Sequence, residues 1–228
     1  MRVPSDTSTW GLRGHVDLGR LAPLIAGVTV ESANADATRF AGPNPEMVSV
    51  VQSIMWADVT TAQLGVFVEG SSAIGRATRL VYGARVDRFS SDAGRADEAT
   101  MGGNGPAPRQ LWRSYTGNDD DEWSSTEIGG LVRVQHTSGA WQLYGGLSRT
   151  ARPADATERF LGANSPTAPM RWIGNPGLAP AISHQLDLGA GWSTADAALG
   201  FALFAADVDD FIVRDRAHGQ PGILQDDR

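Results

Sequence analysis

Hydrophobic and polar residues alternate with a period of two along most of this chain, the pattern of β-strands whose two faces meet different surroundings. The first such segment puts Trp10, Leu12 and Val16 on one face and Arg13 and His15 on the other. Seven later segments repeat the pattern, so the sequence predicts eight antiparallel strands. They span residues 10–18, 26–31, 63–69, 79–87, 128–135, 141–148, 185–192 and 198–203, the last running on into 207–213.

The length of the alternating segments favours a membrane barrel. With their flanks the strands reach about ten to fifteen residues, whereas ~5–6 is usual in soluble proteins and ~9–11 suffice to cross the hydrocarbon of a membrane. No apolar run is long enough for a transmembrane helix, and the only helix-like stretch is 151–161. Barrel strands put every second residue into a polar lumen, which explains the slightly negative mean hydropathy of −0.22.

The connections between the predicted strands alternate in length. Outer-membrane barrels have short periplasmic turns and long external loops, whereas a soluble sandwich has no reason for this alternation. By this rule the first strand runs from the outside inward and the eighth ends outside. We therefore expect residues 1–228 to begin and end within a longer barrel, with the tail 218–228 in an external loop. The short connections are 20–23, 72–76, 137–139 and 194–196, and the long ones are 41–57, 91–122 and 153–183.

Composition removes several classes of function. The chain has no cysteine, which excludes disulfides, thiolate metal ligands and cysteine nucleophiles in these residues. All 19 basic residues are arginine, which excludes a Schiff-base or P-loop lysine. The net charge of −7 argues against a nucleic-acid partner. The sequence lacks the usual hydrolase and metalloprotease motifs, so we expect no enzyme and no cofactor.

Two groups of residues suit the barrel, and each has a simpler interpretation. Five tryptophans near strand ends suit the aromatic belts of a membrane protein or, equally, a sandwich core: Trp10, Trp56, Trp123, Trp141 and Trp192. Seven polar residues are predicted to face the lumen: Arg79, Arg85, Asp87, Arg133, Gln135, Gln185 and Asp187. They either contact a plug or solute or form a solvated wall with internal ion pairs, and the wall is favoured.

Candidate metal ligands are scattered. The acidic run 119–122 suits a divalent cation but is more typical of a solvated loop. The Asp residues within 207–210 are explained by a charged rim above the membrane. Thioethers suit monovalent copper, but neither the methionines nor the histidines cluster at ligand spacing, so no metal ligand is assigned. These residues are Met47, Met101, Met170, His15, His136, His184 and His218.

Three segments carry a resemblance to a known family. Residues 148–160, SRTARPADATERF, resemble the strand-to-loop signature of TonB-dependent outer-membrane receptors. Residues 174–180, GNPGLAP, and the strand 184–189 resemble the loop and strand that follow in that family, although Ala179 and Ala181 replace its usual lysine and acidic residue. Residues 207–212, DVDDFI, are similar to the end of the next strand. Within the family, the set of residues 58–69, 80–88 and 148–160 is most similar to the copper receptors.

The resemblance implies a 22-stranded barrel with a plugged lumen, of which these residues form about a third. It implies active uptake of a metal ion or metal chelate, with copper favoured and an iron siderophore next, in the outer membrane of a Gram-negative bacterium. Its partners are the TonB energy-coupling complex, the ligand and outer-membrane lipid. The plug, the TonB box and the terminal strands are absent from residues 1–228, and no ligand-contacting residue is assigned. We expect the lumen-facing glycines Gly83, Gly146, Gly189 and Gly191 to leave room for the plug.

Other interpretations remain open at this point. A passive outer-membrane channel shares the strand pattern but not the signature of 148–213. A soluble β-sheet domain that binds sugar or protein shares the period of two but not the alternating loops. An outer-membrane enzyme on a small barrel would need a catalytic constellation at its strand ends, and the sequence offers none.

Overall fold

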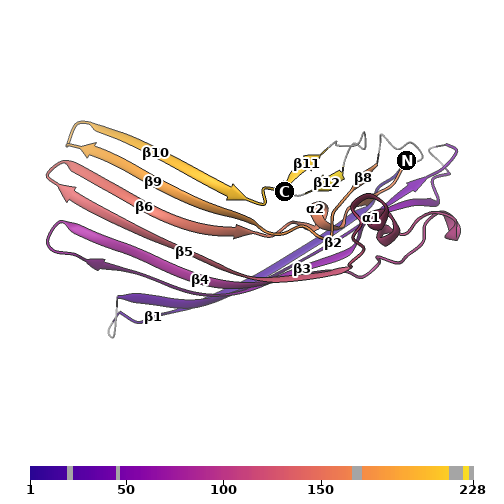
Figure 1. The fold of residues 1–228 in the computed structure, drawn as a ribbon, viewed down its shortest axis with the longest axis horizontal. Coiled ribbons are helices and arrows are strands. Elements are labelled where there is room, and N and C mark those ends of the chain that lie inside the picture. The colour runs from indigo at the N-terminus through magenta and orange to yellow at the C-terminus, as the bar shows by residue number, and fades with distance from the viewer. Residues whose placement is uncertain (20–22, 45–46, 166–170, 216–222, 226–228) are drawn as a thin grey trace.

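The computed structural model describes residues 1–19, 23–44, 47–165, 171–215 and 223–225. Its main feature is one antiparallel sheet with the strand order β1-β2-β3-β4-β5-β6-β9-β10, a succession of hairpins that curves across Figure 1. This confirms the predicted eight-stranded antiparallel fold. The strands are β1 (Ser5–Asp17), β2 (Leu24–Ala41), β3 (Val50–Ala73), β4 (Thr78–Ala93), β5 (Glu122–Ser138), β6 (Trp141–Arg152), β9 (Ala181–Ser193) and β10 (Ala198–Asp209).

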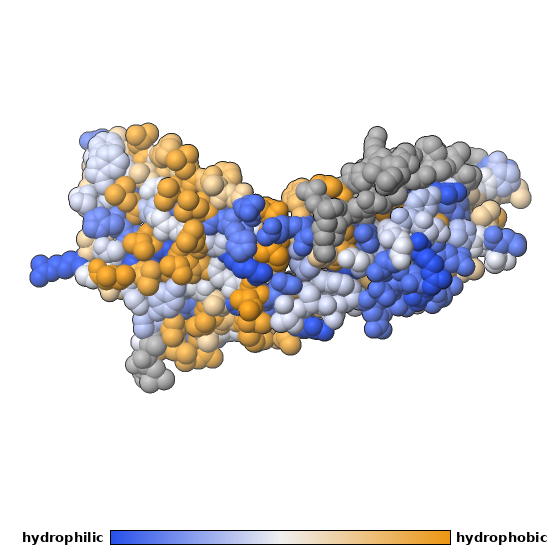
Figure 2. All heavy atoms as spheres, in the orientation of Figure 1, coloured by the Kyte–Doolittle hydropathy of each residue, from blue (hydrophilic) through white to orange (hydrophobic). Residues whose placement is uncertain are grey.

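The strand register gives the sheet two chemically different faces. Paired residues lie on the same face, and Val28, Val66, Val86 and Ile128 form one row across four strands. This outward face exposes large apolar side chains: Ile128 is 62% exposed and Leu199 70%. The opposite, inward face carries the charged and glycine positions. In Figure 2 apolar side chains gather over the strands at one half of the molecule, and hydrophilic ones gather near the helices at the other.

The alternation of loop lengths holds, with one correction. The connections β3–β4, β5–β6 and β9–β10 are short, while β4–β5 and β6–β9 are long. The sequence predicts a long loop over 41–57, but β2 and β3 extend into it and leave only 42–49 between them. Register shifts between Ala35 and Phe40, with Asp58 at a φ of 52°, break the period of two there, so alternation alone misses the upper part of β3.

The long loops contain helices, only one of which the sequence indicates. Helix α2 (Ala156–Phe160) lies inside the predicted helical stretch, and Asp155 caps it by accepting a hydrogen bond from the Glu158 amide at 2.7 Å. Helix α1 (Pro108–Thr116) and the 3-10 turn η1 (Met101–Gly103) lie in a connection predicted to be loop. A proline in the first turn and Gly117 at a φ of 77° mark the ends of α1.

A second, small sheet forms beside the long loops. Its order is β11-β12-β8-β7, from the short strands β7 (Gly162–Ala163), β8 (Trp172–Ile173), β11 (Val213–Asp215) and β12 (Ile223–Gln225). The eighth strand of the main sheet ends at Asp209 and not at 213, because Asp210 turns the chain with a φ of 51°. Of the tail 218–228, only β12 lies within the described residues.

The hydrophobic core lies under the long loops, at one end of the sheet. It joins inward residues of β3, such as Ile54 and Val59, to Trp112 of α1, Phe160 of α2 and Ile173 of β8. The rings of Trp112 and Phe160 are 5.3 Å apart, and the Trp112 indole Nε1 donates to the Leu161 carbonyl at 3.1 Å. We call the packed unit formed by residues 94–121, which include α1, together with α2, β7 and β8 the loop cap. No helix among the described residues is long and apolar enough to cross a membrane.

Candidate functional site

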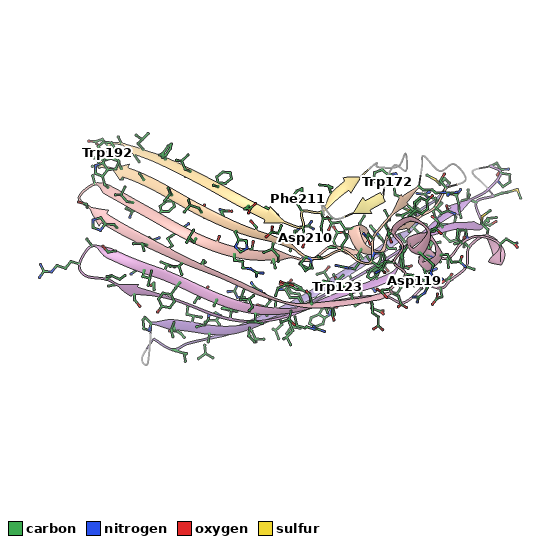
Figure 3. The ribbon with its side chains drawn as sticks, in the orientation of Figure 1. Asp119, Trp123, Trp172, Trp192, Asp210 and Phe211 are labelled. Carbon is green, nitrogen blue, oxygen red and sulfur yellow. The ribbon has the colours of Figure 1, made fainter. Side chains whose placement is uncertain are left out.

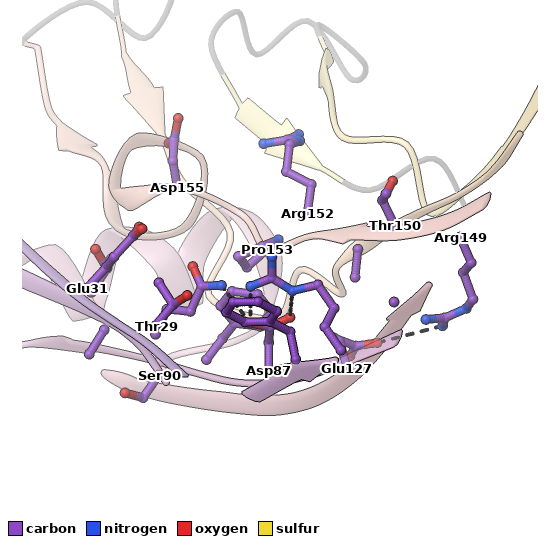
Figure 4. A pocket seen from close by; sticks show the side chains of 18 of the residues that line it. Thr29, Glu31, Asp87, Ser90, Glu127, Arg149, Thr150, Arg152, Pro153 and Asp155 are labelled. Atoms are coloured by element: carbon purple, nitrogen blue, oxygen red, sulfur yellow. Dashed lines mark hydrogen bonds and ion pairs between the residues drawn. The ribbon is translucent and has the colours of Figure 1, made fainter. Parts of the chain in front are cut away.

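The candidate functional site is a hollow of about 870 Å³ on the inward face of strands β1 to β6, beneath the loop cap. Figure 4 shows Glu31, Asp87 and Glu127 along the strands that line the hollow, while Arg152 and Asp155 lie above them, with their charged groups pointing away from Asp87. The side chains reach the hollow because they occupy alternate positions of adjacent strands in register. The hollow therefore combines charged side chains with small and apolar ones.

An arginine–carboxylate pair lies at the centre of the hollow. Arg85 donates from Nε and Nη2 to the two carboxylate oxygens of Asp87, at 2.5 and 2.6 Å, and Gln63 donates to the same carboxylate at 2.7 Å. Asp87 is 5% exposed, because it folds over Gly65, where a Cβ would come within 2.3 Å of it. Three hydrogen bonds from the wall itself hold this carboxylate, which supports the interpretation of a wall with internal ion pairs for these two residues.

The other predicted lumen residues share this face, and several are paired locally. Arg79 lies opposite Gln135 on the neighbouring strand. Gln185 donates to Asp187 at 2.8 Å. The Arg133 guanidinium lies 4.6 Å from the centre of the Tyr144 ring. The structure thus places all seven on the inward face but distributes them along it, and only Arg85 and Asp87 line the hollow.

Inward glycines accommodate aromatic rings of the wall itself. A Cβ on Gly189 would come within 2.1 Å of the Tyr144 ring, and a Cβ on Gly27 within 2.5 Å of Phe67. An arginine lies over each ring in a cation–π contact. The Arg13 guanidinium is 4.6 Å from the centre of the Phe67 ring, and the Arg133 guanidinium is at the same distance from the centre of the Tyr144 ring. The expectation that Gly189 leaves room for a plug is therefore wrong, because Tyr144 occupies that space.

Strands β5 and β6 separate at the edge of the hollow. Their pairing ends at Gly130 and Arg149, above which β6 continues to pair only with β9. Arg149 bridges the opening, donating to the Ile128 carbonyl and lying 3.8 Å from the Glu127 carboxylate (Figure 4). This contact satisfies a strand carbonyl that has lost its partner strand.

One buried arginine fastens the loop cap to the sheet. Arg159 of α2 is fully buried and donates to the carbonyls of Pro176 and Leu178 at 2.5 and 2.8 Å. Its guanidinium lies 3.9 Å from the Trp123 ring centroid on β5. Burial lowers the pKa of Arg159 to about 10, so it stays charged at neutral pH. It thereby joins the two sequence segments, 148–160 and 174–180, that carry the family resemblance.

Most charged side chains of the loop cap form ion pairs with one another or with the sheet. Arg95 bonds to Glu98 at 2.7 Å and to Asp36 at 2.6 Å, and Arg109 bonds to Asp97 at 2.6 Å. The bond to Arg95 holds the pKa of Glu98 below its usual value. In the acidic run, Asp119 pairs with Arg113 and Asp121 with Arg109, which disfavours a cation there. Among the described residues no cluster of three or more His, Asp or Glu suits a metal ion.

The five tryptophans divide into two sets. Trp10, Trp141 and Trp192 lie on the outward face, where Trp10 is 58% and Trp141 48% exposed, and Trp141 pairs with Trp192 near the short turns. Trp56 packs against the core of the loop cap, and Trp123 lies under Arg159. Figure 3 shows Trp192 at one end of the sheet and Trp123 toward the other. Only the first set has positions that suit a membrane belt.

The remaining candidates do not meet at one place. Met47 and Met101 are exposed in separate loops, His15 faces inward on β1, and His136 bonds to the Thr78 hydroxyl at 2.9 Å on the outward face. His184 lies outward, opposite Arg149. Met170 and His218 lie outside the described residues.

Sequence reasoning missed Arg159, Trp112, Phe67 and Tyr144. No local period marks Arg159 or Trp112, because their partners lie in other loops. Phe67 and Tyr144 offered a signal, since each is an aromatic residue at a position where the alternation predicts a polar one. Directly opposite each ring stands a glycine, Gly27 or Gly189, and such cross-strand pairs are a known device of sheets.

Comparison with known proteins gives one family and a set of solved structures. The family described as TonB dependent receptor-like, beta-barrel matches residues 4–225. The structure is similar to the copper transporter OprC, with a TM-score of 0.68 and 21% identity over 92% of this chain and 31% of that one. No curated protein sequence matches significantly.

Two further solved structures share the fold. The Serratia marcescens hemophore receptor HasR, solved with its hemophore HasA and heme, gives a TM-score of 0.59 at 16% identity, over 98% of this chain and 37% of that one. The ferric-catecholate import receptor Fiu of E. coli K12 gives 0.52 at 15%, over 98% and 33%. The chain thus spans about a third of the length of these structures, and its open sheet is part of a larger barrel.

Proposed function

The chain belongs to the family of TonB-dependent receptors, and from this membership we propose that the whole protein imports a metal ion or a metal chelate, with copper favoured. Members of the family are outer-membrane proteins of Gram-negative bacteria, and the exposed apolar face of the sheet suits that location. They are transporters, and we propose no catalytic role for these residues.

The observation that carries the proposal is the match of the family over residues 4–225. Copper is favoured over other ligands because the structure named as a copper transporter has a TM-score of 0.68, against 0.59 and 0.52 for the heme and catecholate receptors. An iron siderophore is the second candidate. Energy would come from the TonB complex, acting through a plug inside the barrel.

The inward hollow has a role in this proposal. Its wall is pre-arranged, because the carboxylate of Asp87 is held by Arg85 and Gln63 and needs no ligand to order it. Glu31 and Glu69 also line the hollow and have no salt bridge among the described residues. We propose that these two carboxylates, at the inward wall, contact either the plug or a cationic ligand on its way through the barrel.

The test is uptake by cells that express the complete receptor gene. Deletion should reduce accumulation of labelled copper under copper limitation, and the complete gene should restore it only in a strain with TonB. Accumulation that is independent of TonB would contradict active uptake. Copper accumulation unchanged by deletion, together with loss of a ferric siderophore, would overturn the choice of copper and leave the family role intact.

A further inference from the structure

The outward apolar face ends abruptly on strands β4 and β5. Val86 and Ile128 are paired neighbours, 41% and 62% exposed. The next outward pair toward the long loops is Arg88 and Thr126, about 7 Å further along the strands. Trp10 lies on β1 one row further, in register with Ser90 through β2 and β3. An aromatic ring and an arginine at this level are typical of a membrane–water interface.

Hydroxyl side chains surround this arginine on the outward surface. Thr60, Ser90 and Ser124 occupy the next outward rows of β3, β4 and β5, and all are exposed. A shallow groove runs among them, with Asp92 and Glu122 at its end nearest the long loops. We call the arginine and its hydroxyl neighbours the hydroxyl patch; it consists of Arg88, Thr60, Ser90, Ser124 and Thr126.

The charge of Arg88 is held in place but not neutralised. Its Nη2 donates to the Ser124 hydroxyl at 2.6 Å and its Nη1 to the Thr126 hydroxyl at 3.3 Å. No carboxylate of the described residues forms a salt bridge with it, whereas Arg85, Arg95 and Arg109 all have such partners. The guanidinium is thus oriented by neutral groups and keeps free N–H donors for an anion.

We propose that the hydroxyl patch binds the headgroup of a phosphorylated glycolipid in the external leaflet of the outer membrane. Arg88 meets the phosphate, for which a guanidinium is well matched. The serine and threonine hydroxyls, with Asp92 and Glu122 above them, meet sugar hydroxyls. The acyl chains then lie over Val86 and Ile128, which the same face exposes directly below. Continuity of charge, hydroxyls and apolar surface is what selects a lipid rather than a soluble anion.

The test uses the complete receptor purified in detergent and measures lipid binding by native mass spectrometry. The probe is a bisphosphorylated diglucosamine lipid, compared with its dephosphorylated form and with phosphatidylethanolamine. Arg88→Gln should weaken binding of the phosphorylated glycolipid about tenfold, as expected for loss of a charge-assisted contact. Arg88→Lys should retain most of it. The matched control is Arg79→Gln on the same strand, which faces inward and should bind as the unchanged receptor does.

Three results would overturn the proposal. They are unchanged glycolipid binding by Arg88→Gln, equal weakening by Arg79→Gln, and displacement of the lipid by inorganic phosphate at millimolar concentration, which would indicate an anion site only. If Arg88→Gln fails to assemble, the double variant Ser124→Ala with Thr126→Ala provides a second test. It removes the two hydroxyls that orient the Arg88 guanidinium and should also weaken glycolipid binding. The proposal rests on the place of the chain in the outer membrane and not on its uptake ligand, so copper uptake can fail while lipid binding stands.

Discussion

Replacing Arg159 with methionine should release the loop cap from the barrel wall while the barrel itself stays folded. Arg159 is fully buried, and its two hydrogen bonds go to backbone carbonyls of the segment 174–180. Methionine fills much the same volume but donates nothing, so the carbonyls of Pro176 and Leu178 lose their partner. The contact with the Trp123 ring loses its charge at the same time.

The expected magnitude follows from these contacts. Two hydrogen bonds from a charged donor are worth about 1.5–3 kcal/mol each, and a desolvated cation–π contact about 2 kcal/mol. Part of this lost free energy is recovered, because methionine carries no charge and the desolvation penalty of the buried guanidinium disappears. A net loss of about 3 kcal/mol corresponds to a loss of roughly a hundredfold in local protection against hydrogen exchange.

Hydrogen exchange in the complete receptor measures this directly. Amides of 156–160 and 174–178 should exchange about a hundredfold faster in Arg159→Met, whereas those of β9 and β10 should not change. Arg159→Lys should give an intermediate result, because an ammonium lacks the planar fork that reaches both carbonyls. Arg76→Met, at an exposed position in the turn between β3 and β4, is the control. Equal exchange in Arg159→Met and the unchanged protein would refute the reasoning.

Three further predictions concern the wall and the cap. Gly189→Val should displace the tyrosine ring that covers it and lower the thermal midpoint in detergent, whereas Gly200→Val, with open space around its Cα, should not. Trp112→Ala should destabilise the cap by about 3–5 kcal/mol, seen as proteolysis within 101–121 at protease levels that leave the unchanged receptor intact; resistance would argue against a packed cap. Because the bond to Arg95 lowers the pKa of Glu98, that pair stabilises the cap above pH 4.5 and the contribution is lost as the pH falls through the lowered pKa. Glu98→Gln should remove this part of the acid dependence of cap proteolysis, and an unchanged pH profile would contradict it.

The period of two predicts the membrane half of the molecule well. Between the short turns and the rows of Val86 and Ile128, one face meets hydrocarbon and the other a polar space, so burial follows sequence parity. Loop lengths then give the orientation of the hairpins. Sequence parity does not predict burial on the side of these rows nearer the long loops. There the loop cap covers the inward face of β3, and Ile54 and Val59 are buried.

The candidate site is predictable only in part. Arg85 and Asp87 are found by parity, but their mutual bond depends on the space over Gly65, which no pattern records. Arg159 depends on contacts with carbonyls 17 and 19 residues away in sequence and with a ring on β5. The resemblance located both loop segments, yet only the structure gives the physical reason that they occur together.

The most direct test of the account is whether adjacent residues of one strand face lipid and lumen in turn. Because residues 1–228 contain no cysteine, single cysteines can be placed along 185–192 in a complete receptor freed of cysteines elsewhere, then spin-labelled and reconstituted in a bilayer. A barrel wall predicts high oxygen accessibility at 186, 188, 190 and 192, and high accessibility to a water-soluble nickel chelate or protein contact at 185, 187, 189 and 191. Two results would contradict the barrel wall and every functional inference built on it. One is accessibility that does not alternate from residue to residue, and the other is high accessibility to oxygen and to the nickel chelate at the same residues.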